Sequence, residues 1–189
     1  MNKTKKQFSH SWAIILGGSS GFGVAAVEKL ATHGMNIAVL YRETAAAERS
    51  LKEKFSLLAK TCEVTIAPFN INALDVSGRN SFIEQFMAIA GKQSVRLLLH
   101  SIARGNLKAL VLPDGDISEK HTILSIEDIQ LTTYAMSTSI LDWTRSLLDA
   151  ALFQPDARII GLTSEGAHKY WDGYAAVCIA KASLESLPT

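Results

Sequence analysis

Five short apolar runs alternate with longer segments of helical periodicity along this chain, and no other feature constrains its fold as strongly. The runs are apolar throughout or nearly so, as strands buried on both faces of a parallel sheet are. Strand–helix–strand alternation implies right-handed crossovers. We therefore expect an α/β protein with an open, doubly wound parallel sheet. The predicted strands are Ala13–Leu16, Asn36–Tyr41, Glu63–Phe69, Val95–His100 and Arg158–Thr163.

The segments between these runs carry apolar residues at helical spacing, as in Phe82, Phe86 and Ile89. The stretch Gly105–Ser125 is the least regular and contains a turn signature at Pro113–Asp116. We interpret it either as a surface loop or as a lid over a substrate. The predicted helices cover residues 24–33, 44–60, 79–90 and 126–153, with a last helix that begins near Tyr174.

Composition is that of one soluble globular domain over residues 12–189, preceded by a tail over residues 1–11: the chain has 189 residues, 48% hydrophobic and 20% charged. Nineteen basic and eighteen acidic residues give a net charge of +1, which argues against a nucleic-acid or anionic-membrane partner. No apolar run approaches the roughly 20 residues of a membrane span. The two cysteines and the scattered histidines suggest neither a disulfide framework nor a metal site. We expect a cytoplasmic protein.

A glycine-rich passage follows the first predicted strand and leads into a helix. Glycines allow a tight turn and let main-chain N–H groups approach a pyrophosphate, and the helix directs its positive N-terminus at the phosphate charge. The same letters also suit a purely structural turn, but the position between strand and helix favours a bound dinucleotide. The candidate cofactor-binding residues here are Gly17, Ser19, Ser20, Gly21, Phe22 and Gly23.

The end of the second predicted strand indicates which dinucleotide is used. An acidic residue there would hydrogen-bond a free ribose 2′-hydroxyl and repel a 2′-phosphate. This strand ends instead at Tyr41-Arg42-Glu43, and Arg42 offers a permanently charged, planar fork for a phosphate. The residue therefore favours NADPH over NADH. In the alternative reading, Glu43 neutralises Arg42 as an ordinary surface pair.

Tyr174 and Lys181 are the candidate catalytic pair. Seven residues are about two helical turns, so both side chains lie on one helix face. A nearby ammonium lowers the pKa of a phenol, which can then donate a proton to an oxygen that gains charge during hydride transfer. The alternative is a half-buried core phenol and a solvated helix charge.

Taken together, these motifs resemble the short-chain dehydrogenase/reductase family, and more narrowly its enoyl-[acyl-carrier-protein] reductase branch. Leu16–Gly23 matches the motif Thr-Gly-x-x-x-Gly-x-Gly, with Leu16 in place of Thr. His100–Arg104 stands where typical members carry Asn-Asn-Ala-Gly, and His-Ser-Ile is similar to the enoyl reductases. The Tyr–Lys spacing of seven, rather than four, is also that of the enoyl reductases. The resemblance implies a Rossmann-type fold.

The resemblance also implies an activity. Tyr174 would assist the enolate formed when NADPH reduces the C=C bond of a trans-2-enoyl thioester in fatty-acid synthesis, and Lys181 would hold the cofactor ribose. Ser164 stands where the family keeps a second Tyr or a Ser, and a Ser is similar to the NADPH-using subgroup. The implied partners are an acyl thioester, on acyl carrier protein, and further copies of the chain in a tetramer or dimer.

Further cofactor contacts follow from matching positions. Asn70 and Ile71 would flank the adenine, with Asn70 in place of a common Asp, while Ser101 and Ile102 would run beside the cofactor through main-chain contacts. Family members are usually longer, and this chain stops inside the helix that carries Lys181. We therefore expect a domain truncated at its C-terminus, without the family's last strands and substrate lid.

Two other functions remain open on this sequence. A ketoacyl or other carbonyl reductase of the same family would use the same hydride donor and the same phenol. A dinucleotide-binding regulatory protein without turnover would need only the glycine-rich loop. A third reading keeps only an α/β domain and treats each motif as packing.

Overall fold

The computed structural model describes residues 7–111 and 123–187. They form two compact units, described separately here: Met1–Ser101 with Trp143–Ile160, and Ile102–Asp142 with Gly161–Thr189. The predicted turn at Pro113–Asp116 lies outside the described residues, and residues 105–111 are in neither helix nor strand. Within the described ranges, no helix combines the length and the hydropathy needed to cross a membrane.

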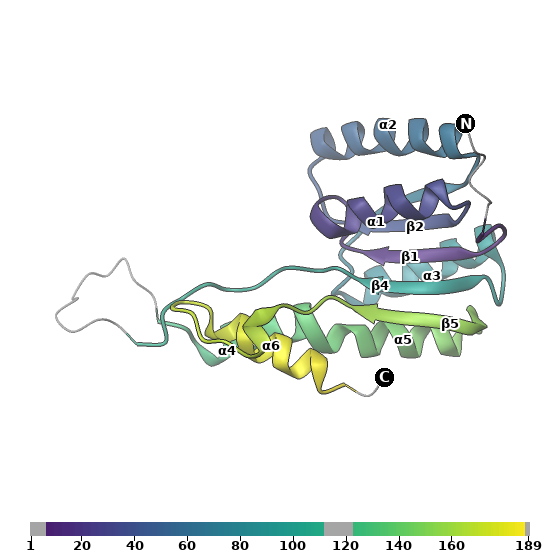
Figure 1. Ribbon diagram of the computed structural model, residues 1–189. Coiled ribbons are helices and arrows are strands. Elements are labelled where there is room, and N and C mark those ends of the chain that lie inside the picture. The colour runs from purple at the N-terminus through teal and green to yellow at the C-terminus, as the bar shows by residue number, and fades with distance from the viewer. Residues whose placement is uncertain (1–6, 112–122, 188–189) are drawn as a thin grey trace. The chain divides into compact units, whose positions relative to one another are not determined.

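The first unit contains a five-stranded sheet in the order β3-β2-β1-β4-β5 (Figure 1). The first strand, β1, lies in the middle of the sheet and pairs in parallel with β2 on one side and β4 on the other. The strands β2 and β3 are also parallel. This confirms the predicted doubly wound parallel sheet. The strands are β1 (Trp12–Leu16), β2 (Asn36–Tyr41), β3 (Ile66–Asn70), β4 (Val95–His100) and β5 (Phe153–Gly161).

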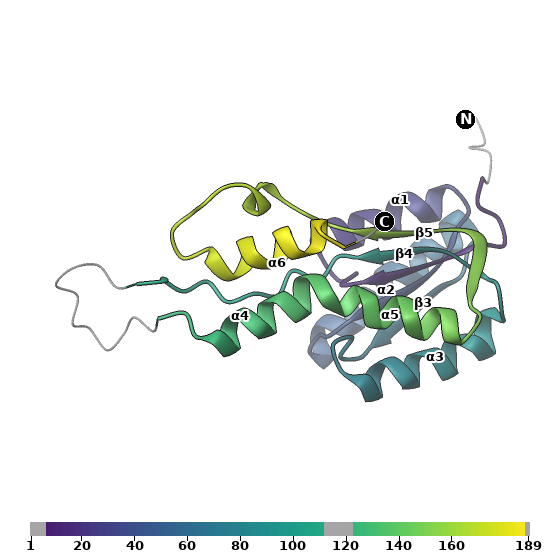
Figure 2. The ribbon, with the colours of Figure 1, turned by 90° about the horizontal axis from the view of Figure 1, so that it is seen from below.

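Three helices of the first unit follow β1, β2 and β3. They are α1 (Gly21–Thr32), α2 (Ala45–Cys62) and α3 (Val76–Ala90). Figure 2 shows α1 and α3 on opposite faces of the sheet. Two begin at side-chain caps: the Thr44 hydroxyl accepts from the N–H of Ala47, and the Asp75 carboxylate accepts from that of Gly78. The cap before α2 fixes where the chain leaves β2.

An aromatic cluster fills the core between the sheet and α3. Phe82 packs edge-on against Phe69 and Trp143 and stacks on Phe86, with ring centroids 4.9–5.4 Å apart. Such pairs stabilise a core beyond the apolar area they bury. The indole N–H of Trp143 donates to the main-chain oxygen of Ala73 over 2.8 Å, so this fully buried ring leaves no polar atom unsatisfied.

Two of the predicted strands are displaced by several residues, and the first strand begins one residue earlier than predicted, at Trp12. The third strand begins at Ile66 rather than Glu63, because Glu63 adopts a left-handed conformation (φ 55°) and ends α2. The fifth strand covers Phe153–Gly161 rather than Arg158–Thr163. It was also expected to be buried on both faces, yet Ile159 and Ile160 are about 45% exposed, because β5 lies at the end of the strand order with one neighbour.

The predicted helix over residues 126–153 is three elements instead of one. The helix α4 (Ile126–Thr133) passes into a π-helical turn (Tyr134–Thr138) and then α5 (Ser139–Asp149). At the turn, the Ser139 hydroxyl donates to the Ala135 oxygen, a bond that competes with the helical pattern. The helix ends before residue 153 because Ala151 has a left-handed φ of 53°.

The second unit is built from α4, the π-helical turn and α6 (Ala175–Glu185). A single 3₁₀ turn (Glu165–Ala167) precedes α6. The Ser137 hydroxyl in the π-helical turn donates to that of Ser183 over 3.3 Å. Packing of α6 against these elements fixes the helix that carries the predicted catalytic pair.

Candidate functional site

The loop between β1 and α1 requires glycine at each of its glycine positions. Gly17 and Gly21 have φ values of 83° and 52°, which side chains rarely adopt. A Cβ on Gly18 would collide with the Val39 side chain, and one on Gly23 would collide with the Gly17 oxygen. Gly17 and Gly21 set the turn, while Gly18 and Gly23 let the loop pack onto β2 and onto itself.

The outer side of the same loop is open. A Cβ placed on Gly21 would meet no atom within 4 Å, and the neighbouring Phe22 is 81% exposed. Ser20 is the N-cap residue of α1 but makes no capping hydrogen bond, and the first turn has no acidic residue. The positive field at the N-terminus of α1 and the Ser20 hydroxyl therefore both remain available to a ligand. This loop fits the pyrophosphate of a dinucleotide.

The chain segment after β4 lies beside the start of this loop. The N–H of Ser101 donates to the oxygen of Leu16 over 2.9 Å, and Leu16 aligns with His100 in the sheet. Predicted cofactor residues at positions 17 and 101 are therefore brought together within the first unit. Ile102 belongs to the second unit, so its predicted role stays a prediction.

The end of β2 presents Arg42 to solvent. The side chain is exposed, and in the described part of the chain it has no ion-pair partner. The alternative reading, in which Glu43 neutralises it, therefore has no support in the structure. A free guanidinium at this strand end suits a phosphate group.

The side chain of Asn70, at the end of β3, binds the turn that follows Arg42. Its Oδ1 accepts from the Glu43 N–H, while its Nδ2 donates to the Glu43 oxygen and to Glu48 Oε2, over 2.9–3.0 Å. Asn70 and Ile71 as neighbours of an adenine remain a prediction. No sequence pattern indicates these contacts, since residues 43 and 70 lie far apart along the chain.

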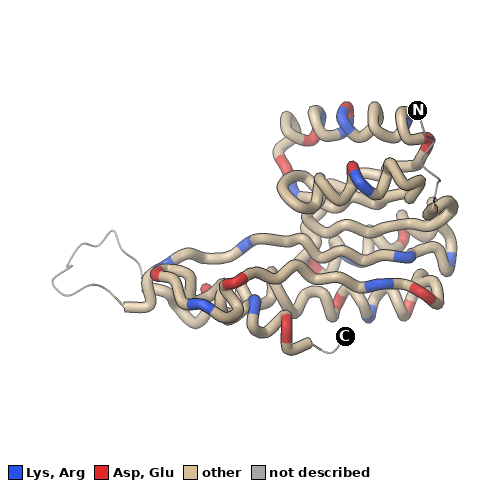
Figure 3. Tube along the Cα trace, in the orientation of Figure 1, with Lys and Arg blue, Asp and Glu red and all other residues tan. Residues whose placement is uncertain are grey.

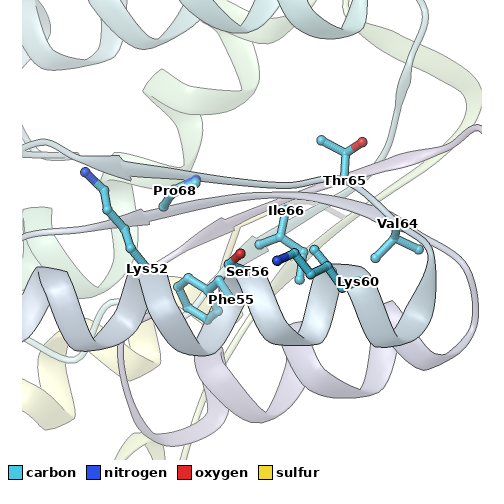
Figure 4. A pocket seen from close by; sticks show the side chains of 9 residues that line it. Lys52, Phe55, Ser56, Lys60, Val64, Thr65, Ile66 and Pro68 are labelled. Atoms are coloured by element: carbon cyan, nitrogen blue, oxygen red, sulfur yellow. The ribbon is translucent and has the colours of Figure 1, made fainter.

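One open groove of about 410 Å³ lies between α2 and β3 (Figure 4). Phe55 and Lys60 of α2 line it together with Ile66 and Pro68 of β3. None of the site residues predicted from the sequence lines this groove.

In the second unit, Lys181 is a buried charge. Its side chain is on α6, the residue is only 7% exposed, and Nζ donates to the main-chain oxygen of Leu162 over 2.6 Å. Burial lowers the pKa of this ammonium below its ordinary value. The alternative of a solvated helix charge is therefore wrong.

Tyr174 is the N-cap residue of α6 and is half-buried. Its ring packs edge-on against Trp171, with centroids 5.7 Å apart. A Cβ on the buried Gly166 would lie 3.2 Å from Tyr174 Cε1 and 3.4 Å from Ser164 Oγ. Two predicted catalytic residues, Tyr174 and Ser164, thus both lie next to Gly166.

Sequence reasoning missed a clamp that holds the Ser164 loop to α6. Glu185, at the last position of α6, accepts a 2.6 Å hydrogen bond from Thr163 Oγ1. Its other oxygen lies 2.9 Å from Nε2 of His168. Together with the Lys181–Leu162 bond, these contacts fix both ends of the loop that carries Ser164. Contacts between a loop and a helix follow no fixed spacing, so no signal in the sequence reveals them.

A second cluster that the sequence did not predict attaches residues 106 and 108 to α4. Asp128, in the first turn of α4, accepts from Lys108 Nζ (2.7 Å) and Asn106 Nδ2 (2.8 Å) and forms a capping box with Ser125. The hydrogen bond from Lys108 is the main cause that lowers the pKa of Asp128. The described residues before position 112 are thus attached to α4, whichever of the two interpretations of Gly105–Ser125 holds.

These elements supply two kinds of chemistry. The glycine loop and Arg42 offer an anion-binding edge in the first unit. The phenol, hydroxyl and ammonium of Tyr174, Ser164 and Lys181 lie on α6 and its preceding loop in the second, where they can hydrogen-bond an oxygen that gains negative charge. In the described ranges, no group of three His, Cys, Asp or Glu residues could hold a metal ion.

Comparisons with known proteins agree with this architecture. The curated "very-long-chain 3-oxoacyl-CoA reductase-like protein" of Arabidopsis thaliana is 26% identical over 182 residues, which are 94% of this chain and 52% of the relative. The NADPH-bound short-chain oxidoreductase of Pseudomonas aeruginosa PAO1, which contains an atypical catalytic center, aligns with a TM-score of 0.74 at 21% identity. FabI of Alistipes finegoldii aligns with a TM-score of 0.71 at 20% identity.

The matched lengths are unequal. This chain is covered to 93% by the Pseudomonas structure and to 96% by FabI, but covers only 62% and 65% of them. It spans about half the length of the curated relative. A family profile described as enoyl-(acyl carrier protein) reductase matches residues 17–188, which includes both compact units. The chain therefore belongs to the short-chain dehydrogenase/reductase family, in the group that this enoyl-(acyl carrier protein) reductase profile defines.

Proposed function

We propose that this protein is an NADPH-dependent oxidoreductase that reduces the C=C bond of a trans-2-enoyl thioester, as an enoyl-[acyl-carrier-protein] reductase of fatty-acid synthesis does. The observation that carries the proposal is the pair on α6: Tyr174, and seven residues later a buried Lys181. The family profile that matches residues 17–188 supports it.

The first unit holds the dinucleotide in this proposal. Main-chain N–H groups of residues 17–23 and the N-terminus of α1 bind the pyrophosphate, and Arg42 binds the 2′-phosphate of the adenosine ribose. Ser101 and Ile102 contact the cofactor through their main chain, and Asn70 with Ile71 borders the adenine. The bound dinucleotide supplies the hydride.

The second unit supplies the acid. Tyr174 donates its hydroxyl proton, or a hydrogen bond, to the thioester oxygen as that oxygen gains charge when the β-carbon is reduced. Lys181 binds the ribose hydroxyls of the cofactor through its ammonium group. Ser164, which like the tyrosine ring lies next to Gly166, hydrogen-bonds the same oxygen.

A carbonyl reductase of the same family is the second candidate. It is favoured by the likeness to the 3-oxoacyl-CoA reductase-like protein, which is 26% identical. Its chemistry would use the same residues, because a ketone oxygen also gains charge when hydride arrives at its carbon. A dinucleotide-binding protein without turnover is a third candidate.

Assays with two alternative substrates distinguish the three candidate functions. The protein is incubated with NADPH and either crotonyl or acetoacetyl thioester, on acyl carrier protein and on coenzyme A, while absorbance of NADPH is followed. Consumption with the crotonyl thioester supports the proposal. Consumption with the acetoacetyl thioester alone identifies a carbonyl reductase, and tight NADPH binding without consumption identifies a binding protein.

The proposed partner is an acyl group carried on acyl carrier protein, and the proposed assembly is a homotetramer or dimer. Light scattering of the purified protein at several concentrations gives the assembly directly. A mass that stays at that of one 20.5 kDa chain would contradict it.

A further inference from the structure

Asn70 commits its whole amide group to the turn after Arg42. Its oxygen accepts from the Glu43 N–H over 3.0 Å, and its nitrogen donates to the Glu43 oxygen over 3.0 Å. The second N–H of the amide donates to Glu48 Oε2 over 2.9 Å. Only one orientation of the amide satisfies all three partners, since one N–H faces its oxygen and two oxygens face its nitrogen. The main chain directly after Arg42 is thereby fixed to the end of β3.

Glu48 is held on both of its oxygens. Asn70 donates to Oε2, and Lys52 lies 2.7 Å from Oε1. The hydrogen bond from Lys52, and then that from Asn70, lower the pKa of this carboxyl, so it is ionised at neutral pH. Both hydrogen bonds turn the carboxylate toward α2 and β3.

Acidic side chains crowd the end of β2. Tyr41, the residue before Arg42, is buried, and burial raises its pKa to about 12, with the charges of Glu48 and Glu43 adding to the effect. Figure 3 shows that α2 and the segment leading into it carry both acidic and basic residues. A guanidinium that directly precedes a glutamate in the chain would ordinarily pair with a nearby carboxylate. Within the described ranges, Arg42 pairs with neither Glu43 nor Glu48.

We propose that Asn70 is a positioning residue for cofactor choice: by fixing the Glu43 main chain and holding Glu48, it leaves the Arg42 guanidinium free for the 2′-phosphate of NADPH. This inference rests on the proposed role of Arg42. It gives Asn70 a task that a carboxylate could not perform, because both of its donors face oxygen atoms. NADH lacks the 2′-phosphate, so its affinity does not depend on this arrangement.

A double-mutant cycle tests the proposal on the full 189-residue chain. Dissociation constants of NADPH and NADH are measured by fluorescence titration for the wild type, Asn70→Ala, Arg42→Ala and the double variant. We expect Arg42→Ala to weaken NADPH about tenfold or more, as loss of a charged hydrogen bond does. Asn70→Ala should weaken NADPH about fivefold and change NADH by less than about twofold, with no further loss once Arg42 is absent.

Asn36→Ala is the matched control. Asn36 stands at the other end of β2, and its side-chain oxygen accepts from the N–H of Thr65 over 2.8 Å, so it also bridges β2 to the start of β3. The control should change the affinities for the two cofactors equally. Asn70→Asp is a second variant, which keeps the acceptor for Glu43 but loses both donors. The new carboxylate would repel the phosphate of NADPH whether or not Arg42 is present. Measuring Asn70→Asp in the wild-type and in the Arg42→Ala background therefore separates this repulsion from the proposed coupling.

The outcomes distinguish a failure of the proposed role of Arg42 from a failure of the proposed role of Asn70. If Arg42→Ala leaves the ratio of NADPH to NADH affinity unchanged, both the role of Arg42 and this inference are wrong. If Arg42→Ala lowers that ratio but Asn70→Ala weakens both cofactors equally, or adds fully to Arg42→Ala, only the inference is overturned. A selective loss of NADPH affinity that vanishes without Arg42 supports it.

Discussion

The Nζ atom of Lys181 lies 2.6 Å from the main-chain oxygen of Leu162 and donates a hydrogen bond to it. Leu162 directly follows β5, and two residues later comes Ser164. The buried ammonium therefore ties α6 to the start of the loop that carries a candidate catalytic serine. One side chain thus has a structural contact as well as its proposed part in the chemistry.

That burial gives a prediction for stability against pH. The pKa of Lys181 is lowered in the folded chain, so between its folded and unfolded values the unfolded chain binds more protons. The free energy of unfolding should therefore rise with pH across this window, and the full cost of the buried charge should be present below it. Lys181→Met should remove this rise, as measured by urea unfolding at several alkaline pH values.

The control for this experiment is Lys169→Met. The Lys169 side chain is 60% exposed, and among the described residues it pairs only with Glu165, four residues earlier. This variant should keep the pH dependence of the wild type. A Lys181→Met profile parallel to the wild-type profile would contradict the assignment of a depressed pKa to Lys181.

Tyr174→Phe should abolish most of the proposed activity while sparing cofactor binding. The variant keeps the ring that packs against Trp171 and loses only the hydroxyl that would donate to the thioester oxygen. Loss of a general acid lowers the rate about a hundredfold or more. The turnover number for a crotonyl thioester and the dissociation constant of NADPH are measured together. Tyr170→Phe, at a residue 72% exposed, should leave both unchanged, and an unchanged rate in Tyr174→Phe would assign the proton to another group.

Gly166→Ala should disturb Tyr174 and Ser164 together. The added methyl group would lie 3.2 Å from the tyrosine ring and 3.4 Å from the serine hydroxyl, so the neighbours must move by a few tenths of an ångström. Displacements of catalytic groups are costly, and we expect turnover to fall about tenfold with NADPH affinity unchanged. In a Tyr174→Phe background the same substitution should cost less. A full additional loss there would show that Gly166 acts independently of the tyrosine.

Much of the first unit could be predicted from the sequence. The bounds of β2 and β4 agree with the structure because both are largely apolar runs with a neighbouring strand on each side. The glycine loop was predictable for a similar reason, since the backbone conformations at Gly17 and Gly21 admit few other residues. In each case a local physical requirement selects the residue type.

The remaining features depend on contacts between distant residues. Glu63 directly precedes a largely apolar run in sequence but ends α2 in a left-handed conformation. The π-helical turn at Tyr134–Thr138 has an α-helix on each side, so helical periodicity in the sequence does not reveal it. Asn70 and Glu185 are polar residues whose hydrogen-bond partners lie 27 and 22 positions away in the sequence. Their roles in holding a turn and a loop in place are therefore visible only in the three-dimensional structure.

Glu185→Ala should weaken catalysis through the Ser164 loop. Removing the carboxylate breaks the 2.6 Å bond from Thr163 and the 2.9 Å contact with His168, which together hold this loop to the end of α6. We expect turnover to fall about fivefold, with the dissociation constant of NADPH within about twofold of wild type, because the glycine loop belongs to the other unit. Glu185→Gln keeps an acceptor for Thr163 and should recover part of the rate. The matched control is Glu165→Ala, which removes a 70% exposed carboxylate that pairs only with Lys169. Equal losses of rate in Glu185→Ala and Glu165→Ala would mean that the clamp does not position Ser164.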